Sequence, residues 1–113
     1  MRIYLTGPMS GYPNFNYPAF SRVAAVLRDC GYTVLNPAEF LLGWQGLPWI
    51  VYIVVDLFVL VFMGDAVARL RGWEKSRGSR IEIWVAEKLK KPVGNWEWYL
   101  TVHPMIAERE KRQ

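Results

Sequence analysis

The residues best suited to chemistry lie in one basic stretch broken by glycines, Gly72-Trp-Glu-Lys-Ser-Arg-Gly-Ser-Arg-Ile-Glu82. The stretch leads from an apolar segment into a predicted helix, so we expect Glu82 in the first turn of that helix. There the helix dipole and Arg80 would favour the ionised carboxylate. Ser76, the neighbouring cations and the backbone N–H groups of a helix start are suited to hold a phosphate. The stretch therefore predicts a site where a carboxylate meets a phosphorylated ligand.

A structural interpretation of the same glutamate stays open. Ser79 and Glu82 have the spacing of a capping box, in which the two side chains satisfy N–H groups at the helix start. In the chemical interpretation, Glu82 is a nucleophile that divides glycosidic cleavage into two easier steps through a glycosyl ester. Residue type and spacing alone do not separate the two.

A second acid, Asp56, lies inside an otherwise apolar segment, residues 49–63. An unpaired charge there would be costly, so Asp56 must find partners, bind a proton or line a polar site. The chain has one cysteine, Cys30, and one histidine, His103, which are too few for a zinc site. We expect no metal and no other cofactor, and we assign Cys30 and His103 no chemistry.

Short apolar runs alternate with amphipathic segments, and this alternation predicts the elements that must position the two acids. Strands are expected at residues 3–5, 33–35, 66–70 and from 92, and helices from 18 to the stop at Gly31, at 49–63 and at 79–89. The pattern predicts one three-layer α/β domain over residues 1–113, with a charged tail at about 104–113. Its sheet should be parallel, with four to five strands, and of the flavodoxin-like or Rossmann-like kind.

Sheets of this kind bind ligands beyond the carboxyl ends of their strands. The loop after the first strand contains Gly7, Met9, Ser10 and Gly11, and the basic stretch follows the third strand. We therefore expect both loops to face one cleft. The chain contains no G-x-G-x-x-G and no P-loop motif, which argues against a dinucleotide or P-loop site.

Composition limits the partners. Apolar residues make up 52% of the chain and the net charge is +4, which favours a folded protein that binds anionic small molecules such as a nucleotide. Nucleic acid is not expected as a partner, because the basic residues follow one loop and one helix end without a recognition-helix pattern. The N-terminus turns polar early, unlike a signal peptide, and with the single cysteine this favours a cytoplasmic location.

The chain resembles the nucleoside 2-deoxyribosyltransferase superfamily, most closely its small phage-type and bacterial branch of unknown function. The motifs that carry the resemblance lie between Met1 and about Val93, and are Ile3-Tyr-Leu-Thr-Gly-Pro-Met-Ser-Gly11, Asn36-Pro-Ala-Glu39, Asp56-Leu57, Asp65-Ala-Val67 and Gly72-Trp-Glu-Lys-Ser-Arg-Gly78. The resemblance implies chemistry at the N-glycosidic bond of a 2-deoxyribonucleoside. It implies that Glu82 attacks the anomeric carbon, that Asp56 assists proton transfer or orients the sugar, and that Tyr4 contacts the nucleophile or the sugar.

The resemblance also bears on the substrate. In the transferases of the superfamily an aspartate stands six residues before the nucleophile, whereas Ser76 stands there in this chain. The pattern Ser76-x-Gly78-x-x-x-Glu82 resembles the branch that hydrolyses deoxynucleoside 5′-monophosphates, in which the serine binds phosphate. We therefore expect Ser10, Ser76 and Arg80 to face a phosphate, and Trp73 either to stack on the base or to pack in the core.

Residues 49–63 are apolar on all sides, although a helix on one face of a sheet needs one buried stripe. The residues expected to point outward are Ile50, Val54, Phe58 and Val61. An exposed stripe marks a protein contact, so we expect a homo-oligomer through the helix at about 48–63, whether natural or engineered. A membrane span is disfavoured, because the run is shorter than the usual ~20 residues and contains Asp56.

Two further departures concern the site itself. Asp56 and Asp65 are further apart than in the resembling family, and Arg69 and Arg71 occupy positions that are typically apolar or proline there. The leading expectation is an N-glycosidase acting on a 2′-deoxynucleoside 5′-monophosphate through a glycosyl-glutamate intermediate. The alternatives are deoxyribosyl transfer between bases, and a non-catalytic homo-oligomeric scaffold or nucleotide-binding protein.

Overall fold

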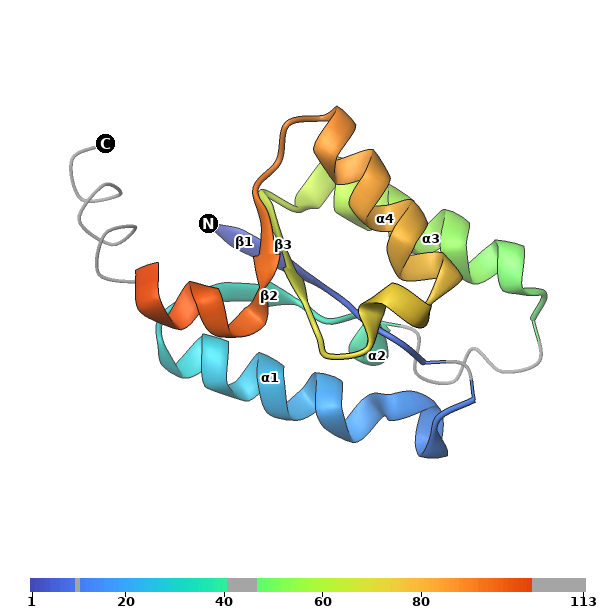
Figure 1. Cartoon of the computed structure of the whole chain (residues 1–113), viewed down its shortest axis with the longest axis horizontal. Helices are drawn as coiled ribbons and strands as arrows, with labels where there is room; N and C mark the ends of the chain where they lie inside the picture. The colour runs from blue at the N-terminus through green and yellow to red at the C-terminus, as the bar shows by residue number, and fades with distance from the viewer. Residues whose placement is uncertain (10, 41–46, 103–113) are drawn as a thin grey trace.

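A computed structural model of the chain describes residues 1–9, 11–40 and 47–102 (Figure 1). In chain order the elements are β1 (Arg2–Thr6), η1 (Pro13–Asn16), α1 (Tyr17–Asp29), β2 (Thr33–Leu35), α2 (Pro37–Phe40), α3 (Trp49–Met63), β3 (Ala66–Arg69), η2 (Trp73–Lys75), α4 (Arg77–Lys88) and β4 (Val93–Asn95). Residues 96–102 are also helical, which the sequence did not lead us to expect. The predicted charged tail lies outside the described residues.

The four strands form one parallel sheet in the order β2-β1-β3-β4. The central pair, β1 and β3, is in register from Ile3 opposite Ala66 to Thr6 opposite Arg69. The order 2-1-3-4 is that of flavodoxin-like doubly wound sheets, whose topological switch point lies between the first and third strands. The predicted three-layer α/β fold with a parallel sheet is confirmed.

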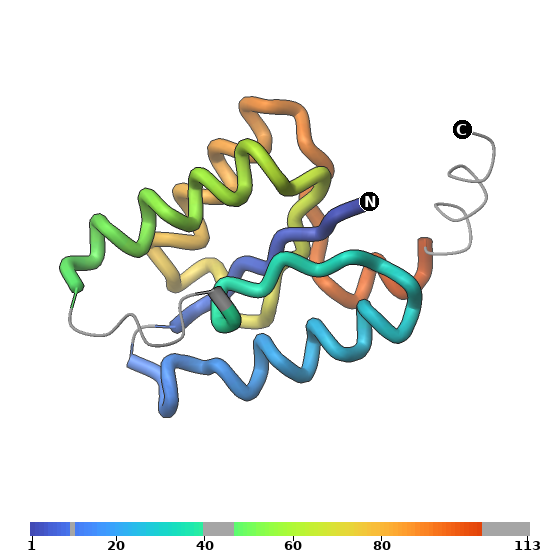
Figure 2. Tube along the Cα trace, turned by 180° about the vertical axis from the view of Figure 1, so that it is seen from behind, coloured from blue at the N-terminus to red at the C-terminus, as the bar shows by residue number. Residues whose placement is uncertain are grey.

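Helices cover both faces of the sheet. Figures 1 and 2 show α1 and the last helical residues on one face, and α3 and α4 side by side on the other. Successive β1 side chains point to opposite faces. Ile3 and Leu5 therefore belong to the core cluster that contains α1, whereas Tyr4 belongs to the cluster beneath α3 and α4. The strand thus supplies apolar packing to one layer and polar hydroxyl groups to the other.

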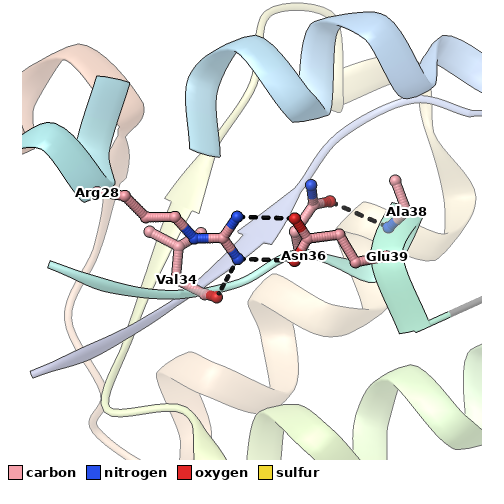
Figure 3. A network of polar contacts seen from close by, with 5 residues as sticks. All are labelled: Arg28, Val34, Asn36, Ala38 and Glu39. Carbon is pink, nitrogen blue, oxygen red and sulfur yellow. Dashed lines mark hydrogen bonds and ion pairs between the residues drawn. The ribbon is translucent and has the colours of Figure 1, made fainter. Parts of the chain in front are cut away.

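An ion pair joins α1 to the end of β2 and to α2 (Figure 3). The two terminal nitrogens of Arg28 donate to the two carboxylate oxygens of Glu39, each at 2.7 Å, and one of them also donates to the carbonyl of Val34 at 2.9 Å. Asn36 accepts a hydrogen bond from the backbone N–H of Ala38 through its side-chain oxygen at 3.0 Å. The Asn36-Pro-Ala-Glu39 motif therefore fixes the turn that leaves β2.

Helix α3 has the predicted bounds and presents a row of exposed side chains at every fourth position. Ile50, Val54, Phe58 and Phe62 are 57–69% exposed, and the rings of Phe58 and Phe62 lie 4.8 Å apart. Val61, expected to point outward, is half-buried instead, because the i+4 row continues to Phe62. Within the part of the chain that the structure describes, no helix combines the length and the apolar character needed to cross a membrane.

Candidate active site

The carboxylate of Glu82 is held by two hydroxyl groups of β1. Tyr4 donates to one carboxylate oxygen at 2.7 Å and Thr6 donates to the other at 2.8 Å. Tyr4 and Thr6 are two residues apart on one strand, so both face α4. All three side chains are buried, and Glu82 is 5% exposed. Tyr4 and Glu82 could be named from the sequence, whereas Thr6 was missed, although its i+2 spacing from Tyr4 was the available signal.

Glu82 does not lie in the first turn of its helix, which corrects the prediction. Helix α4 begins at Arg77, so Glu82 is its sixth residue. The N-cap is Ser76, whose hydroxyl oxygen accepts a hydrogen bond from the backbone N–H of Ser79 at 3.2 Å. The side chain of Ser79 is buried with its oxygen unpaired among the described residues. The capping-box interpretation of Ser79 and Glu82 is therefore wrong, and Glu82 has no capping role.

Burial, and not the helix dipole, dominates the charge state of Glu82. Loss of solvent and, to a lesser degree, the charge of Asp56 raise the pKa of Glu82 to about 8, against the hydrogen bonds from Tyr4 and Thr6 that lower it. The expectation that Arg80 keeps Glu82 ionised is wrong, because Arg80 is exposed and two positions away, on another side of the helix. Burial also raises the pKa of Tyr4 well above its usual value, so Tyr4 stays a hydrogen-bond donor.

Asp56 on α3 is the second acid of the site. Burial raises the pKa of Asp56 to about 7, and one of its carboxyl oxygens is buried without a hydrogen-bond partner among the described residues. Because the charge of Asp56 acts on Glu82, the two carboxyl groups titrate as a pair. The prediction that Asp56 would bind a proton or line a polar site fits this environment.

This pair can hold one acid and one carboxylate at the same time. With both pKa values raised to between about 7 and about 8, the pair retains a proton at neutral pH. The pKa of Glu82 is the higher of the two, so Glu82 holds the shared proton in the resting site, although the two donated hydrogen bonds favour its negative charge. Two neighbouring carboxyl groups with different protonation states are the basic equipment of acid–base and nucleophilic catalysis.

The loops that follow β1 and β3 meet at the carboxyl edge of the sheet. A Cβ placed on Gly72 would lie 3.0 Å from the Tyr12 hydroxyl and 3.2 Å from Pro8, so the two loops are in contact. A Cβ on Gly7 would lie 2.7 Å from that of Leu70, which explains why a glycine stands there. Met9 packs partly against the core, Gly11 is exposed with a φ of 82°, and Ser10 lies outside the described residues.

Other predicted site residues lie along α4 and the turn before it. A Cβ on Gly78 would meet Ile53 of α3 at 3.6 Å, so this glycine lies against that helix. Trp73 lies under the guanidinium of Arg69, 4.7 Å from the ring centre. Arg80 lines a surface hollow of about 400 Å³ together with Arg77, Ile81 and Trp84, and Glu82 is not part of that lining.

In the described part of the chain, no three histidine, cysteine or acidic side chains gather as metal ligands would. No curated protein matches the chain. A family model described as a domain of unknown function, DUF4406, matches residues 1–95, which include both β1 hydroxyl groups, both acids and the entire sheet. The chain therefore belongs to the DUF4406 family.

Proposed function

We propose that the protein is a retaining N-glycosidase that cleaves the base from a 2′-deoxynucleoside 5′-monophosphate. The observation that carries the proposal is the carboxylate of Glu82 held between the hydroxyl groups of Tyr4 and Thr6, with Asp56 as a coupled second acid. Because Ser76 provides the cap, Glu82 is not needed to cap α4. The resemblance to the deoxyribosyltransferase superfamily supports the choice of the glycosidic bond.

In the first step, Glu82 attacks the anomeric carbon of the deoxyribose and the bond from that carbon to the base nitrogen breaks. Asp56 delivers its proton to the departing base, either directly or through water, and becomes a carboxylate. This step requires the proton that the pair shares to lie on Asp56, and a pKa of about 7 suits a group that takes up and releases a proton near neutral pH. The products are the free base and a glycosyl ester on Glu82.

In the second step, Asp56 accepts a proton from a water molecule whose oxygen attacks the same carbon. The ester bond to Glu82 breaks and the carboxylate is regenerated, with net retention at the anomeric carbon after two displacements. Tyr4 and Thr6 stabilise the departing carboxylate through the two hydrogen bonds they already make. If a second base replaced water, the same intermediate would give deoxyribosyl transfer, which the serine at position 76 disfavours.

The test is the release of free base, followed by chromatography, from a panel of deoxynucleosides and their 5′-monophosphates. We expect release from the monophosphates by the wild-type protein and none by Glu82→Gln, which keeps the size of the side chain. The matched control is Glu87→Gln, an exposed glutamate one turn further along α4, which should leave the rate unchanged. Release that persisted in Glu82→Gln would contradict the proposal, as would its absence from the wild-type protein.

We also propose that copies of the chain associate through the exposed row on α3. A ridge of residues four apart is the surface that fits a second helix, and one charge-free ridge can pack against its own copy about a two-fold axis. Ile50, Val54, Phe58 and Phe62 form such a ridge. A non-catalytic scaffold would need only this surface. Association and base release are therefore measured separately.

A further inference from the structure

We propose that Arg69 binds the phosphate group of the ligand and so makes the site select phosphorylated over unphosphorylated nucleosides. This inference rests on the proposed function, because it assigns a residue to the phosphate of that substrate. Arg69 departs from the residue type typical of the resembling family, and the sequence alone suggested no role for it.

The register of the sheet places Arg69 beside the site. Arg69 is the last residue of β3 and pairs with Thr6, the last residue of β1. Paired residues on neighbouring strands point to the same face, about 5 Å apart. Thr6 donates to Glu82, so Arg69 leaves the sheet on the face of the candidate nucleophile. The backbone N–H of Leu70 donates to the carbonyl of Thr6 at 2.8 Å and fixes the two strand ends together.

This position is the topological switch point of the sheet. The chain leaves β1 toward α1 on one face and leaves β3 toward α4 on the other, and the crevice between such strand ends is where doubly wound sheets bind ligands. In this chain the crevice has a carboxylate on one side, Glu82, and an arginine at the matching position of the next strand, Arg69. A nucleoside monophosphate carries its reacting carbon and its phosphate on one sugar. A carboxylate and an arginine at the same crevice could therefore each meet one of these two groups.

The side chain of Arg69 has no anionic partner among the described residues. Its Nε is buried and makes no hydrogen bond there, and its guanidinium lies over the ring of Trp73. The positive charge of Arg69 lowers the pKa of Tyr99, a neutral phenol. An unsatisfied buried donor is costly, and a guanidinium that lies over an aromatic ring can still donate hydrogen bonds to a phosphate.

The residues first expected to hold the phosphate are placed differently. Arg80 is exposed and lines the separate hollow on α4, and the oxygen of Ser76 is engaged as the cap. The Ser76 hydroxyl hydrogen and the N–H groups at the start of α4 can still contribute. These groups carry no full positive charge to balance a phosphate, and Arg69 supplies one.

Calorimetric titration with 2′-deoxyguanosine and its 5′-monophosphate tests this inference without turnover, in the Glu82→Gln background. We expect the monophosphate to bind at least about tenfold more tightly than the nucleoside, and Arg69→Met to remove that difference while nucleoside affinity stays the same. Arg71→Met removes the same charge two residues away on an exposed side chain and should change neither affinity. Arg69→Lys should keep part of the preference, and it replaces Arg69→Met if that variant does not fold.

Three results would overturn the inference: equal loss of both affinities in Arg69→Met, an equal effect of Arg71→Met, or a wild-type site indifferent to the phosphate. Titration with inorganic phosphate separates a general anion site from a nucleotide site, because a general site would bind it as tightly as the monophosphate. Selective binding that depends on Arg69, without base release by the wild-type protein, would contradict the glycosidase proposal and support the phosphate site. Base release at equal rates from nucleosides and monophosphates would support the glycosidase and contradict the phosphate site.

Discussion

The phenol of Tyr4 and the carboxylate of Glu82 are 78 positions apart in the sequence and 2.7 Å apart in the structure. The contact forms only when α4 docks on the sheet, because one partner lies in the first strand and the other in the last long helix. Burial raises the pKa of both groups, although the hydrogen bond from Tyr4 lowers that of Glu82, so the site holds a proton at a cost in stability.

Glu82→Gln is expected to stabilise the fold at alkaline pH. The pKa of Glu82 is about 8 in the folded protein and near 4.5 in an exposed glutamate, so the folded state binds the extra proton between these values. The stability from this group is therefore present in full below about pH 4.5 and is lost as the pH rises toward 8. One pKa unit is about 1.4 kcal/mol, so the glutamine variant should exceed the wild type by at least ~2 kcal/mol at pH 9.

The measurement is urea unfolding of both proteins between pH 5 and pH 9. Glu87→Gln should follow the wild-type curve, because Glu87 is exposed on the same helix. Parallel curves for the wild type and Glu82→Gln would show that Glu82 titrates normally.

Removing a β1 hydroxyl should push the pKa of Glu82 still higher. Tyr4→Phe and Thr6→Val each delete one donor to the carboxylate, and both hydrogen bonds favour the anion. If Glu82 must be ionised to react, the rising limb of kcat/KM against pH should move to higher pH in both variants. Tyr12→Phe alters an exposed tyrosine and should not move the limb. An unshifted limb in Tyr4→Phe would mean that the phenol does not act on the reacting group.

Two serines three residues apart should respond in opposite ways to the same substitution. Ser76→Ala removes the N-cap of α4 and should lower the free energy of unfolding by ~0.5–2 kcal/mol. Ser79→Ala removes a buried, unpaired hydroxyl and should be neutral or slightly stabilising. Ser76→Asp restores a good cap and should recover the stability. The measurement is thermal unfolding of the three variants. A loss of stability confined to Ser79→Ala would show that Ser79, and not Ser76, caps the helix.

A charge on the outer row of α3 should separate associated copies. Val54→Glu and Phe58→Glu place a carboxylate at positions 57% and 61% exposed, so neither change disturbs the core. We expect the mass measured by sedimentation equilibrium to fall to that of one chain in the double variant. Ala25→Glu adds the same charge to an exposed position on α1, on the opposite face, and should leave the mass unchanged. An identical mass for wild type and double variant would remove α3 as the interface.

The layer order and the elements could be predicted because they depend on local patterns. The run from Trp49 to Met63 contains no breaker and ends at Gly64, so α3 has its predicted bounds. The start of α4 could not be placed by the same means, since Ser76 and Ser79 are both good caps and the choice depends on which hydroxyl the docked helix buries. The helical residues 96–102 were missed because Tyr99 is held by tertiary contacts, among them its hydrogen bond to the carbonyl of Val67.

Candidate site residues could be named from the sequence where their type is conspicuous, and were overlooked where their position in the fold decides. A buried acid such as Asp56 is conspicuous in any apolar run. Thr6 and Arg69 lie side by side because of the register of β1 and β3, which no local pattern contains. The charge state of Glu82 was predicted wrongly for a related reason, because desolvation depends on what covers a residue and not on its neighbours in the chain.

The alternation along β1 has a consequence for how this family can change over time. Ile3 and Leu5 meet a demand for volume, which many aliphatic combinations satisfy, whereas Tyr4 and Thr6 meet a demand for particular atoms in particular places. If Glu82 reacts as proposed, we expect substitutions on these two faces of β1 to have independent effects. In a saturation scan of this strand, base release should be most sensitive to substitution at Tyr4 and Thr6. Stability should be most sensitive to polar substitution at Ile3 and Leu5.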